Sequence, residues 1–268
     1  MAIITLTTDW GISDHYIAAV KGLIISRLPG AMIVDISHAI EKFSISHAAY
    51  VLEHSYKNFP DGSIHIVGVD FQIEIKEDDD YDPETIEVYH AIVCYNKHYF
   101  VGLNNGIFTL LCNNNPDKII KISAPPKMKS FIFPAYTIYA GIACEIASGT
   151  PVDKLGVEKK KLFFVNKFKP AIQNDSISGI VAYIDSYGNA ITNISMDEFE
   201  EVRGKRNFAI YFRNHTITKI SRNYSEETGG ELMALFGSSG MLEIAVVKGS
   251  AKKLLGAGFY DSIRVDFA

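Results

Sequence analysis

The segment at residues 3–16, I-I-T-L-T-T-D-W-G-I-S-D-H-Y, constrains the fold of this chain most strongly. Its aliphatic residues and intervening threonines are typical of a short buried strand. The strand runs directly into Asp9, and Ser13 and Asp14 are suitable N-caps for a helix that begins near His15. A strand followed at once by a helix predicts the first half of a βαβ unit.

Asp9 has two interpretations at this position. Ligands of open α/β sheets bind just beyond the carboxyl ends of the strands, which is where Asp9 lies. An ionised carboxylate there can accept hydrogen bonds from two neighbouring hydroxyl groups, such as those of a ribose. The alternative is that Asp9 only caps the turn after the strand.

The strand–helix pattern is repeated along the next fifty residues. The expected elements are a helix at 16–28, a strand at 31–37, a helix at 46–56 and a strand at 63–69. The last of these strands ends at Asp70. Because parallel strands present their carboxyl ends at one edge of a sheet, Asp9 and Asp70 are expected at the same edge. This pairing indicates a ligand site more specifically than either aspartate alone.

Phe43, just before the second helix, also has two interpretations. It is either a hydrophobic staple at the entry of that helix or an aromatic wall for a planar ligand. The sequence alone favours the staple.

The remaining pattern predicts two domains. The first continues with strands at 90–94 and 99–101, a turn at 96–97, and helices at 107–112 and 133–148. Residues 159–170 are typical of a linker. Beyond residue 175 the expected elements are strands at 179–184, 208–212, 215–220, 232–236, 242–247 and 263–266, with a short helix at 250–255. The predicted fold class is α/β: an N-terminal α/β sandwich domain with a largely parallel sheet at 1–165, and a small antiparallel, barrel-like β domain at 175–268.

Composition excludes several functional classes. With 268 residues and 47% hydrophobic residues, the chain can bury a substantial core. The net charge of −5 argues against a nucleic-acid or membrane-surface partner. Cys94, Cys112 and Cys144 are odd in number and widely spaced, which indicates neither disulfides nor a zinc site. The acidic run at 78–82 lacks the spacing of a calcium loop. We therefore expect no metal, no cofactor and a cytoplasmic location.

The second domain carries the most specific motif, I-D-S-Y-G-N-A-I-T-N-I at 184–194. Asp185 can accept a hydrogen bond from an ammonium group, the Asn189 amide can pair with an adenine edge, and the ring of Tyr187 can stack on a base. The alternative is a well-formed hairpin turn, since Asp, Gly and Asn favour turns for their own reasons. In the loop F-G-S-S-G at 236–240, Ser238 and Ser239 can bind a carboxylate, or the loop is a plain connection.

Three separated motifs resemble those of one family, the S-adenosylmethionine hydroxide adenosyltransferases, which are S-adenosylmethionine hydrolases related to the bacterial fluorinase and chlorinase. They are T-T-D-W-G-x-x-D-x-Y near the start, D-x-Y-G-N-x-x-T-N-I, and G-S-S-G-x-L-E-I-A-V followed by G-S-A-K-K-L-L-G. The resemblance runs in the same order from residue 2 to about residue 267. It implies an N-terminal α/β domain, a C-terminal β domain, and a homotrimer with each site between two subunits.

The resemblance also implies roles for single residues. The implied substrate-binding positions are Asp9, Trp10, Phe43, Asp185, Tyr187, Asn189, Ser238, Ser239 and Ala245. By this resemblance, Asp9 holds the ribose hydroxyls and Phe43 lines the sugar pocket. The methionine amino and carboxylate groups meet Asp185 and Ser238. The adenine is framed by Tyr187, Asn189 and the backbone near Ala245.

The expected catalytic residue is Asp70, which matches the aspartate of an Asp–Arg–His set that holds the attacking water in this family. The sequence departs from the family pattern at the other two members. The Arg is missing from the segment after Asp70, and F-P-A-Y-T at 133–137 stands where the family has F-H-G-R-D. Lys76 and Tyr136 are the candidate substitutes. A carboxylate at Asp70 would repel a halide, so halogenation is not expected.

Three functions follow as alternatives. The first is hydrolysis of S-adenosylmethionine by water at the ribose C5′, giving adenosine and L-methionine, slowly because the Arg and His are missing. The second is a catalytically weak or inactive protein that binds S-adenosylmethionine or adenosine. The third is a trimeric interaction protein with a vestigial pocket.

Overall fold

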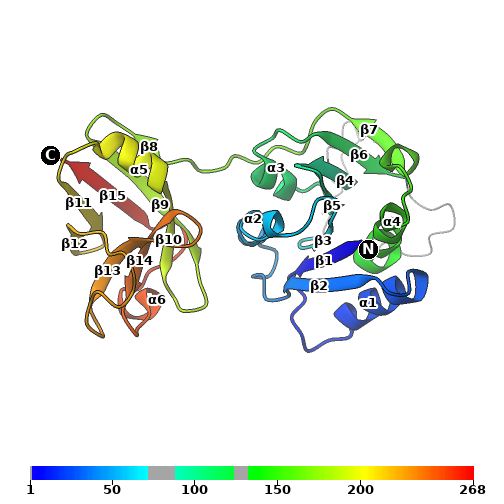
Figure 1. Ribbon diagram of the computed structural model, residues 1–268, viewed down its shortest axis with the longest axis horizontal. Helices are drawn as coiled ribbons and strands as arrows, with labels where there is room; N and C mark the ends of the chain where they lie inside the picture. The colour runs from blue at the N-terminus through cyan, green and yellow to red at the C-terminus, as the bar shows by residue number, and fades with distance from the viewer. Residues whose placement is uncertain (1, 72–87, 124–131) are drawn as a thin grey trace, which may run out of the picture. The chain divides into compact units, whose positions relative to one another are not determined.

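The structure is a computed structural model, and it describes residues 2–71, 88–123 and 132–268. It divides into two compact units, Met1–Lys167 and Phe168–Ala268 (Figure 1). Each unit has its own hydrophobic core. The expected domains, 1–165 and 175–268, fall within these two units.

A seven-stranded mixed sheet forms the centre of the first unit, in the order β2-β1-β3-β5-β4-β6-β7. Its strands are β1 (Ile3–Thr8), β2 (Met32–Ser37), β3 (Ile64–Gly68), β4 (His90–Tyr95), β5 (His98–Leu103), β6 (Lys118–Ile122) and β7 (Gly156–Lys159). The pairs β2–β1, β1–β3 and β3–β5 are parallel, and the pairs from β5 to β7 are antiparallel. The parallel part is the one in which two strands end beside Asp9 and Asp70.

Helices cover both faces of this sheet, which makes the unit an α/β sandwich (Figure 1). On one face lie α1 (Tyr16–Arg27), the π-helix η2 (Ala135–Tyr139) and α4 (Ala140–Ala147), and on the other α2 (Ile45–Glu53) and α3 (Ile107–Cys112). Two short 3₁₀ turns, η1 (Tyr56–Asn58) and η3 (Val152–Lys154), complete the described elements. The expected α/β class is confirmed.

Two local expectations are wrong. Helix α1 has His15 at its N-cap with no side-chain cap hydrogen bond, so neither Ser13 nor Asp14 caps it. Helix α2 ends at Glu53, three residues earlier than expected, because the chain tightens into the η1 turn around the buried Tyr56.

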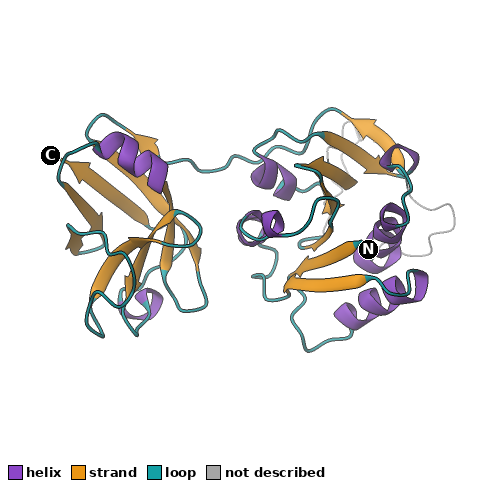
Figure 2. Ribbon diagram, in the orientation of Figure 1, coloured by secondary structure: helices purple, strands orange, loops and turns teal. Residues whose placement is uncertain are grey.

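The second unit is built mainly of β-strands (Figure 2). These strands pair antiparallel in the order β12-β11-β15-β9-β10-β14-β13, and β8 pairs with β9. Its strands are β8 (Ala171–Ile172), β9 (Ser176–Ile184), β10 (Ala190–Ser195), β11 (Phe208–Phe212), β12 (His215–Ile217), β13 (Leu232–Phe236), β14 (Met241–Val246) and β15 (Ser262–Phe267). A bridge between Ile220 and Ala234 brings the chain after β12 against β13, the far end of the strand order. The sheet therefore curls on itself, as the barrel-like prediction requires.

Two short helices accompany this sheet, α5 (Met196–Arg203) and α6 (Ala251–Leu254). The sequence analysis did not predict α5, although Ser195 and Glu198 form a complete capping box at its start. Phe199 of α5 is fully buried against the rings of Phe208, Phe236 and Phe267. This contact explains why α5 is stable despite its highly charged sequence.

The acidic run at 78–82 lies outside the described residues. Among the helices that the structure describes, none has the length and apolarity needed to cross a membrane.

Candidate active site

Hydrogen bonds hold the loop after β2 against the end of β1. The Thr8 hydroxyl and the His38 Nδ1 atom lie 2.7 Å apart, and the backbone N–H of Ile40 donates to the Thr8 carbonyl at 3.3 Å. The backbone N–H of Gly11 donates to the His38 carbonyl at 2.8 Å. These bonds fix the backbone on both sides of Asp9, the first residue after β1.

Asp9 is 7% exposed, and one of its two carboxylate oxygens accepts a hydrogen bond. Its Oδ2 atom accepts a hydrogen bond from the backbone N–H of Phe43 at 3.0 Å, and the Lys42 ammonium donates to its backbone carbonyl. Among the described residues, none donates a hydrogen bond to Oδ1. The carboxylate is thus held by one oxygen and can accept a ligand hydroxyl with the other.

Phe43 has an unusual backbone conformation for a bulky residue, with φ at 62°. Its ring is 62% exposed, while the next residue, Ser44, caps α2 by accepting the N–H of His47 at 3.3 Å. An exposed ring does not act as a buried staple, so the structure favours the other interpretation, a wall beside Asp9. Left-handed strain at such a residue is typical of functional sites.

Asp70 lies at the same sheet edge as Asp9, as predicted, because β1 and β3 are parallel and pair Thr8 with Gly68. Asp70 has φ at 48°, and the Asn105 side chain donates to the carbonyls of Asp70 at 2.9 Å and of Val69 at 3.3 Å. The Asn105 amide therefore stabilises a turn that departs from the strand direction.

Trp10 covers Gly68 and begins a group of aromatic rings on the α1 side of the sheet. Any side chain at residue 68 would collide with the Trp10 ring. The Trp10 ring centroid is 5.0 Å from that of Phe133 and 6.0 Å from that of Phe71. Phe71 in turn lies 5.9 Å from the Tyr139 ring. Trp10 is thus a packing residue within its own unit.

The segment at 133–137, F-P-A-Y-T, leads into η2, which begins at Ala135. Its Tyr136 is 41% exposed and stacks on Phe133, with ring centroids 6.3 Å apart and planes within 3°. Pro134 and Ala135 supply no ionisable group at the expected histidine position. The other proposed substitute, Lys76, lies outside the described residues.

In the second unit, Asp185 and Asn189 bind each other. The Asp185 carboxylate accepts the backbone N–H of Asn189 at 2.8 Å and its side-chain amide at 3.0 Å. Gly188 has φ at 85° and packs against Ser250, which leaves no room for a side chain. The motif is therefore a rigid hairpin turn, and it presents the 79% exposed Tyr187 to solvent.

The loop at 236–240 is a tight turn between β13 and β14. The backbone N–H of Gly240 donates to the Gly237 carbonyl at 2.9 Å, and Ser239 Oγ accepts the N–H of Met241 at 3.4 Å. Ser238 is exposed at the tip. Ala245, further along β14, is fully buried and pairs with Met233.

Sequence reasoning missed a buried charge beside this loop. Glu243 of β14 is 5% exposed and accepts a hydrogen bond from the hydroxyl of Tyr224. Burial raises the pKa of both groups, and the Asp185 carboxylate adds to both increases. The sequence did offer a signal for this residue: Glu243 is an acidic residue within the otherwise apolar strand motif L-E-I-A-V.

The candidate site residues offer mainly carboxylates and aromatic rings. The part of the chain that the structure describes contains no cluster of three or more potential metal ligands. Burial raises the pKa of the Cys94 and Cys112 thiols to about 11, so neither is a thiolate nucleophile near neutral pH.

Comparison with known proteins identifies the family. The model of the SAM hydroxide adenosyltransferase N-terminal domain matches residues 4–156, and that of the C-terminal domain matches residues 179–264. The chain belongs to the SAM hydroxide adenosyltransferase family. Asp9 and Asp70 lie within the first match, and Asp185 lies within the second.

Relatives of this chain match it over most of its length. A protein of Methanocaldococcus jannaschii named (R)-S-adenosyl-L-methionine hydrolase is 31% identical over 98% of this chain and 95% of its own. A Thermus thermophilus protein of the same name is 28% identical over 93% of each chain. A fluorinase of Nocardia brasiliensis is 23% identical over 75% of this chain and 73% of its own. In structure, a conserved Thermotoga maritima protein superposes with a TM-score of 0.86 at 26% identity, over 99% of this chain and all of its own.

Proposed function

We propose that this chain binds S-adenosylmethionine and hydrolyses it to adenosine and L-methionine. The observation that carries the proposal is the pair of carboxylates, Asp9 and Asp70, at one edge of the parallel part of the sheet in a chain of the SAM hydroxide adenosyltransferase family. The two relatives named as hydrolases, at 31% and 28% identity, support the same reaction.

In the first unit, the residues hold the sugar and the water. The Oδ1 atom of Asp9 accepts a ribose hydroxyl, and the exposed Phe43 ring packs against the sugar. Asp70 accepts a hydrogen bond from water and directs it at C5′. As the water oxygen bonds to C5′, the C5′–S bond breaks, its electron pair goes to sulfur, and a water proton is released toward Asp70. The leaving thioether is neutral, so no general acid is needed and orientation supplies much of the rate.

In the second unit, the residues hold the two ends of the ligand. Asp185 takes the ammonium group of the methionine moiety, and Ser238 and Ser239 take its carboxylate. The adenine lies between the Tyr187 ring, Asn189 and the Ala245 backbone. We further propose that the protein is a homotrimer and that each ligand is bound by the first unit of one subunit and the second unit of another. The reaction would take place in the cytoplasm, where the three free thiols stay reduced.

The proposed trimer has a direct test. The mass in solution, measured by light scattering at micromolar concentration, is expected to be three times the 29.7 kDa chain, because a shared site requires a permanent interface. A monomer under these conditions contradicts the shared site.

A second candidate function is binding with little or no hydrolysis. It is favoured by the segment at 133–137, where Pro134 and Ala135 replace polar groups and Tyr136 stacks on Phe133. Chromatography of the products separates the two functions, since only hydrolysis releases adenosine and methionine.

Asp9→Asn tests the binding half of the proposal. Asparagine can still accept the Phe43 N–H, but it loses the charge that binds the ribose hydroxyls. Since a hydrogen bond to a charged group is worth about 1.5–3 kcal/mol, we expect the Kd for S-adenosylmethionine to rise about tenfold or more. Calorimetry on both proteins measures this, with Asp14→Asn, an exposed change in the same unit, as the control. Equal affinities, or no binding by the unchanged protein, contradict the proposal.

A further inference from the structure

The segment at residues 221–230, which we name the strap, connects β12 to β13 and is fixed at both ends. The backbone N–H of Ser221 donates to the Ala234 carbonyl on β13, and that of Gly230 donates to the Val247 carbonyl beyond β14, each at 2.8 Å. The strap thus begins at one strand of the β13–β14 hairpin and ends at the other.

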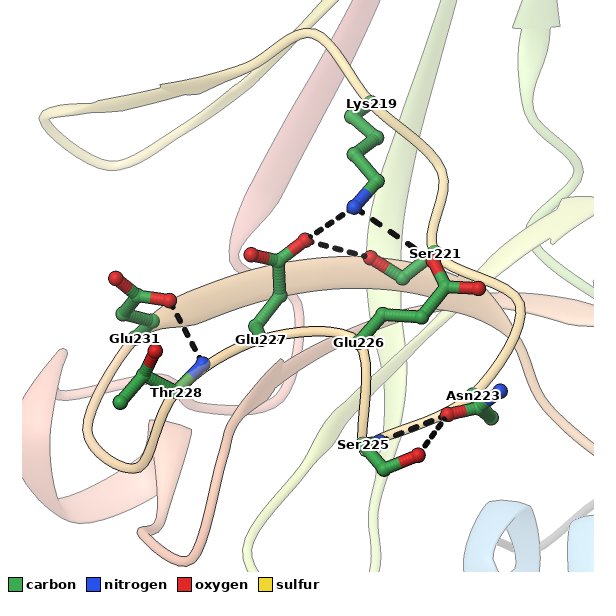
Figure 3. A network of polar contacts seen from close by, with 8 residues as sticks. All are labelled: Lys219, Ser221, Asn223, Ser225, Glu226, Glu227, Thr228 and Glu231. Carbon is green, nitrogen blue, oxygen red and sulfur yellow. Dashed lines mark hydrogen bonds and ion pairs between the residues drawn. The ribbon is translucent and has the colours of Figure 1, made fainter.

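Polar side chains hold the strap in shape (Figure 3). At its base, the Lys219 ammonium binds Glu227 at 2.6 Å and Glu226 at 3.6 Å. Near its tip, Asn223 accepts hydrogen bonds from the backbone N–H of Ser225 at 2.9 Å and from its hydroxyl at 2.6 Å. These contacts are all local to the segment and its immediate flanks.

Tyr224 instead reaches from the strap to the hairpin. Its hydroxyl donates to Glu243 Oε1. In the strand register Glu243 lies opposite Leu235 and two residues from Ala245, and both of these belong to a small buried cluster separate from the barrel core. The Glu243 carboxylate therefore sits on an otherwise apolar sheet face, where a buried charge requires a hydrogen-bond partner.

Glu243 also lies against the serine loop of the candidate site. Its Oε2 atom is only 2.5 Å from the point that a Cβ on Gly237 would occupy, so it lies directly under the serine loop at 236–240. Tyr224 is within electrostatic reach of Asp185 and Tyr187. The pair thus lies next to the serine loop and interacts electrostatically with the Asp185 turn.

We propose that Glu243 is a positioning residue of this site. By binding the Tyr224 hydroxyl it holds the strap against the β13–β14 hairpin, keeps the Tyr224 ring beside the Asp185 turn, and so increases the affinity for the ligand. The tethering of the strap does not depend on the proposed function, whereas the effect on ligand affinity rests on it.

A double-mutant cycle tests the coupling. Tyr224→Phe and Glu243→Met each remove the hydrogen bond while preserving approximate size, so each is expected to raise the Kd for S-adenosylmethionine about tenfold. The double variant should bind no more weakly than the weaker-binding single variant, because both changes remove the same contact. Glu243→Gln retains an acceptor and should restore part of the affinity. Tyr211→Phe, at a half-exposed tyrosine on β11, is the control.

Trypsin cleavage after Arg222, an exposed residue of the strap, tests the tether without any ligand. Tyr224→Phe and Glu243→Met are expected to accelerate this cleavage several-fold at unchanged global stability. Faster cleavage with no ligand binding by the unchanged protein overturns the proposed function and leaves the tether intact. Unchanged cleavage, additive losses of affinity, or losses that merely follow unfolding overturn the inference itself.

Discussion

Asp70→Asn is expected to reduce adenosine release from S-adenosylmethionine at least about a hundredfold, the usual contribution of a group that handles a proton. Asparagine is the informative replacement because Asp70 has φ at 48°, a conformation that asparagine adopts more readily than alanine. The change therefore removes the charge while keeping the turn that Asn105 supports. Binding of the substrate should be nearly unchanged.

Long incubations followed by chromatography measure this effect, because the sequence lacks the Arg and His that the resemblance implies and a slow reaction is therefore expected even in the unchanged protein. Asp117→Asn, at an exposed carboxylate of the same unit just before β6, is the control. Brisk adenosine release that survives Asp70→Asn would show that another group directs the water. Weakened binding at an unchanged maximal rate would instead assign Asp70 to substrate binding.

Acidification is expected to destabilise the first unit strongly, because the folded unit holds the buried His65 and the half-buried His90 as neutral rings. His65 is fully buried, with Nδ1 at 2.7 Å from the Thr5 hydroxyl and Nε2 at 3.1 Å from His98. Burial, aided by His98, lowers the pKa of His65 to about 3, and burial lowers that of His90 to about 4. Both pKa values lie below the ordinary 6.5 of the unfolded chain.

The sign follows from proton binding. Between about pH 6.5 and pH 3, His65 is protonated in the unfolded chain but stays neutral in the folded protein. Protons therefore favour the unfolded chain, and the stability present above pH 6.5 is lost as the pH falls. His65 alone accounts for roughly 5 kcal/mol across this range and roughly half of that by about pH 4.5.

Urea unfolding at a series of pH values measures this loss. Fluorescence is a specific probe, because Trp10 is the only tryptophan and lies in the first unit. His65→Gln should lower stability at pH 7 but flatten its dependence on pH, while His15→Gln, at an exposed histidine of the same unit, should leave the slope unchanged. An unaltered slope in His65→Gln would assign the acid sensitivity to other groups.

Much of the fold could be predicted because its signals are local. Alternating aliphatic and β-branched residues marked β1 and β3, and both runs end next to an aspartate, so the shared edge of Asp9 and Asp70 followed from the βαβ pattern. Similarly, the helix expected at 107–112 coincides with α3. Helix α5 was missed because its sequence is highly charged and Phe199 is its one buried residue.

The sequence by itself determined the two-part α/β and β organisation, the family, and which acidic residues end the parallel strands. Only the tertiary structure decided how side chains distant in the sequence meet. It exposed the Phe43 ring by a left-handed backbone, placed Trp10 over Gly68, and joined Tyr224 to the buried Glu243. The physical reason is that periodicity reports which face of an element is buried. The partner that a buried group finds depends instead on strand register and on loops that cross between strands.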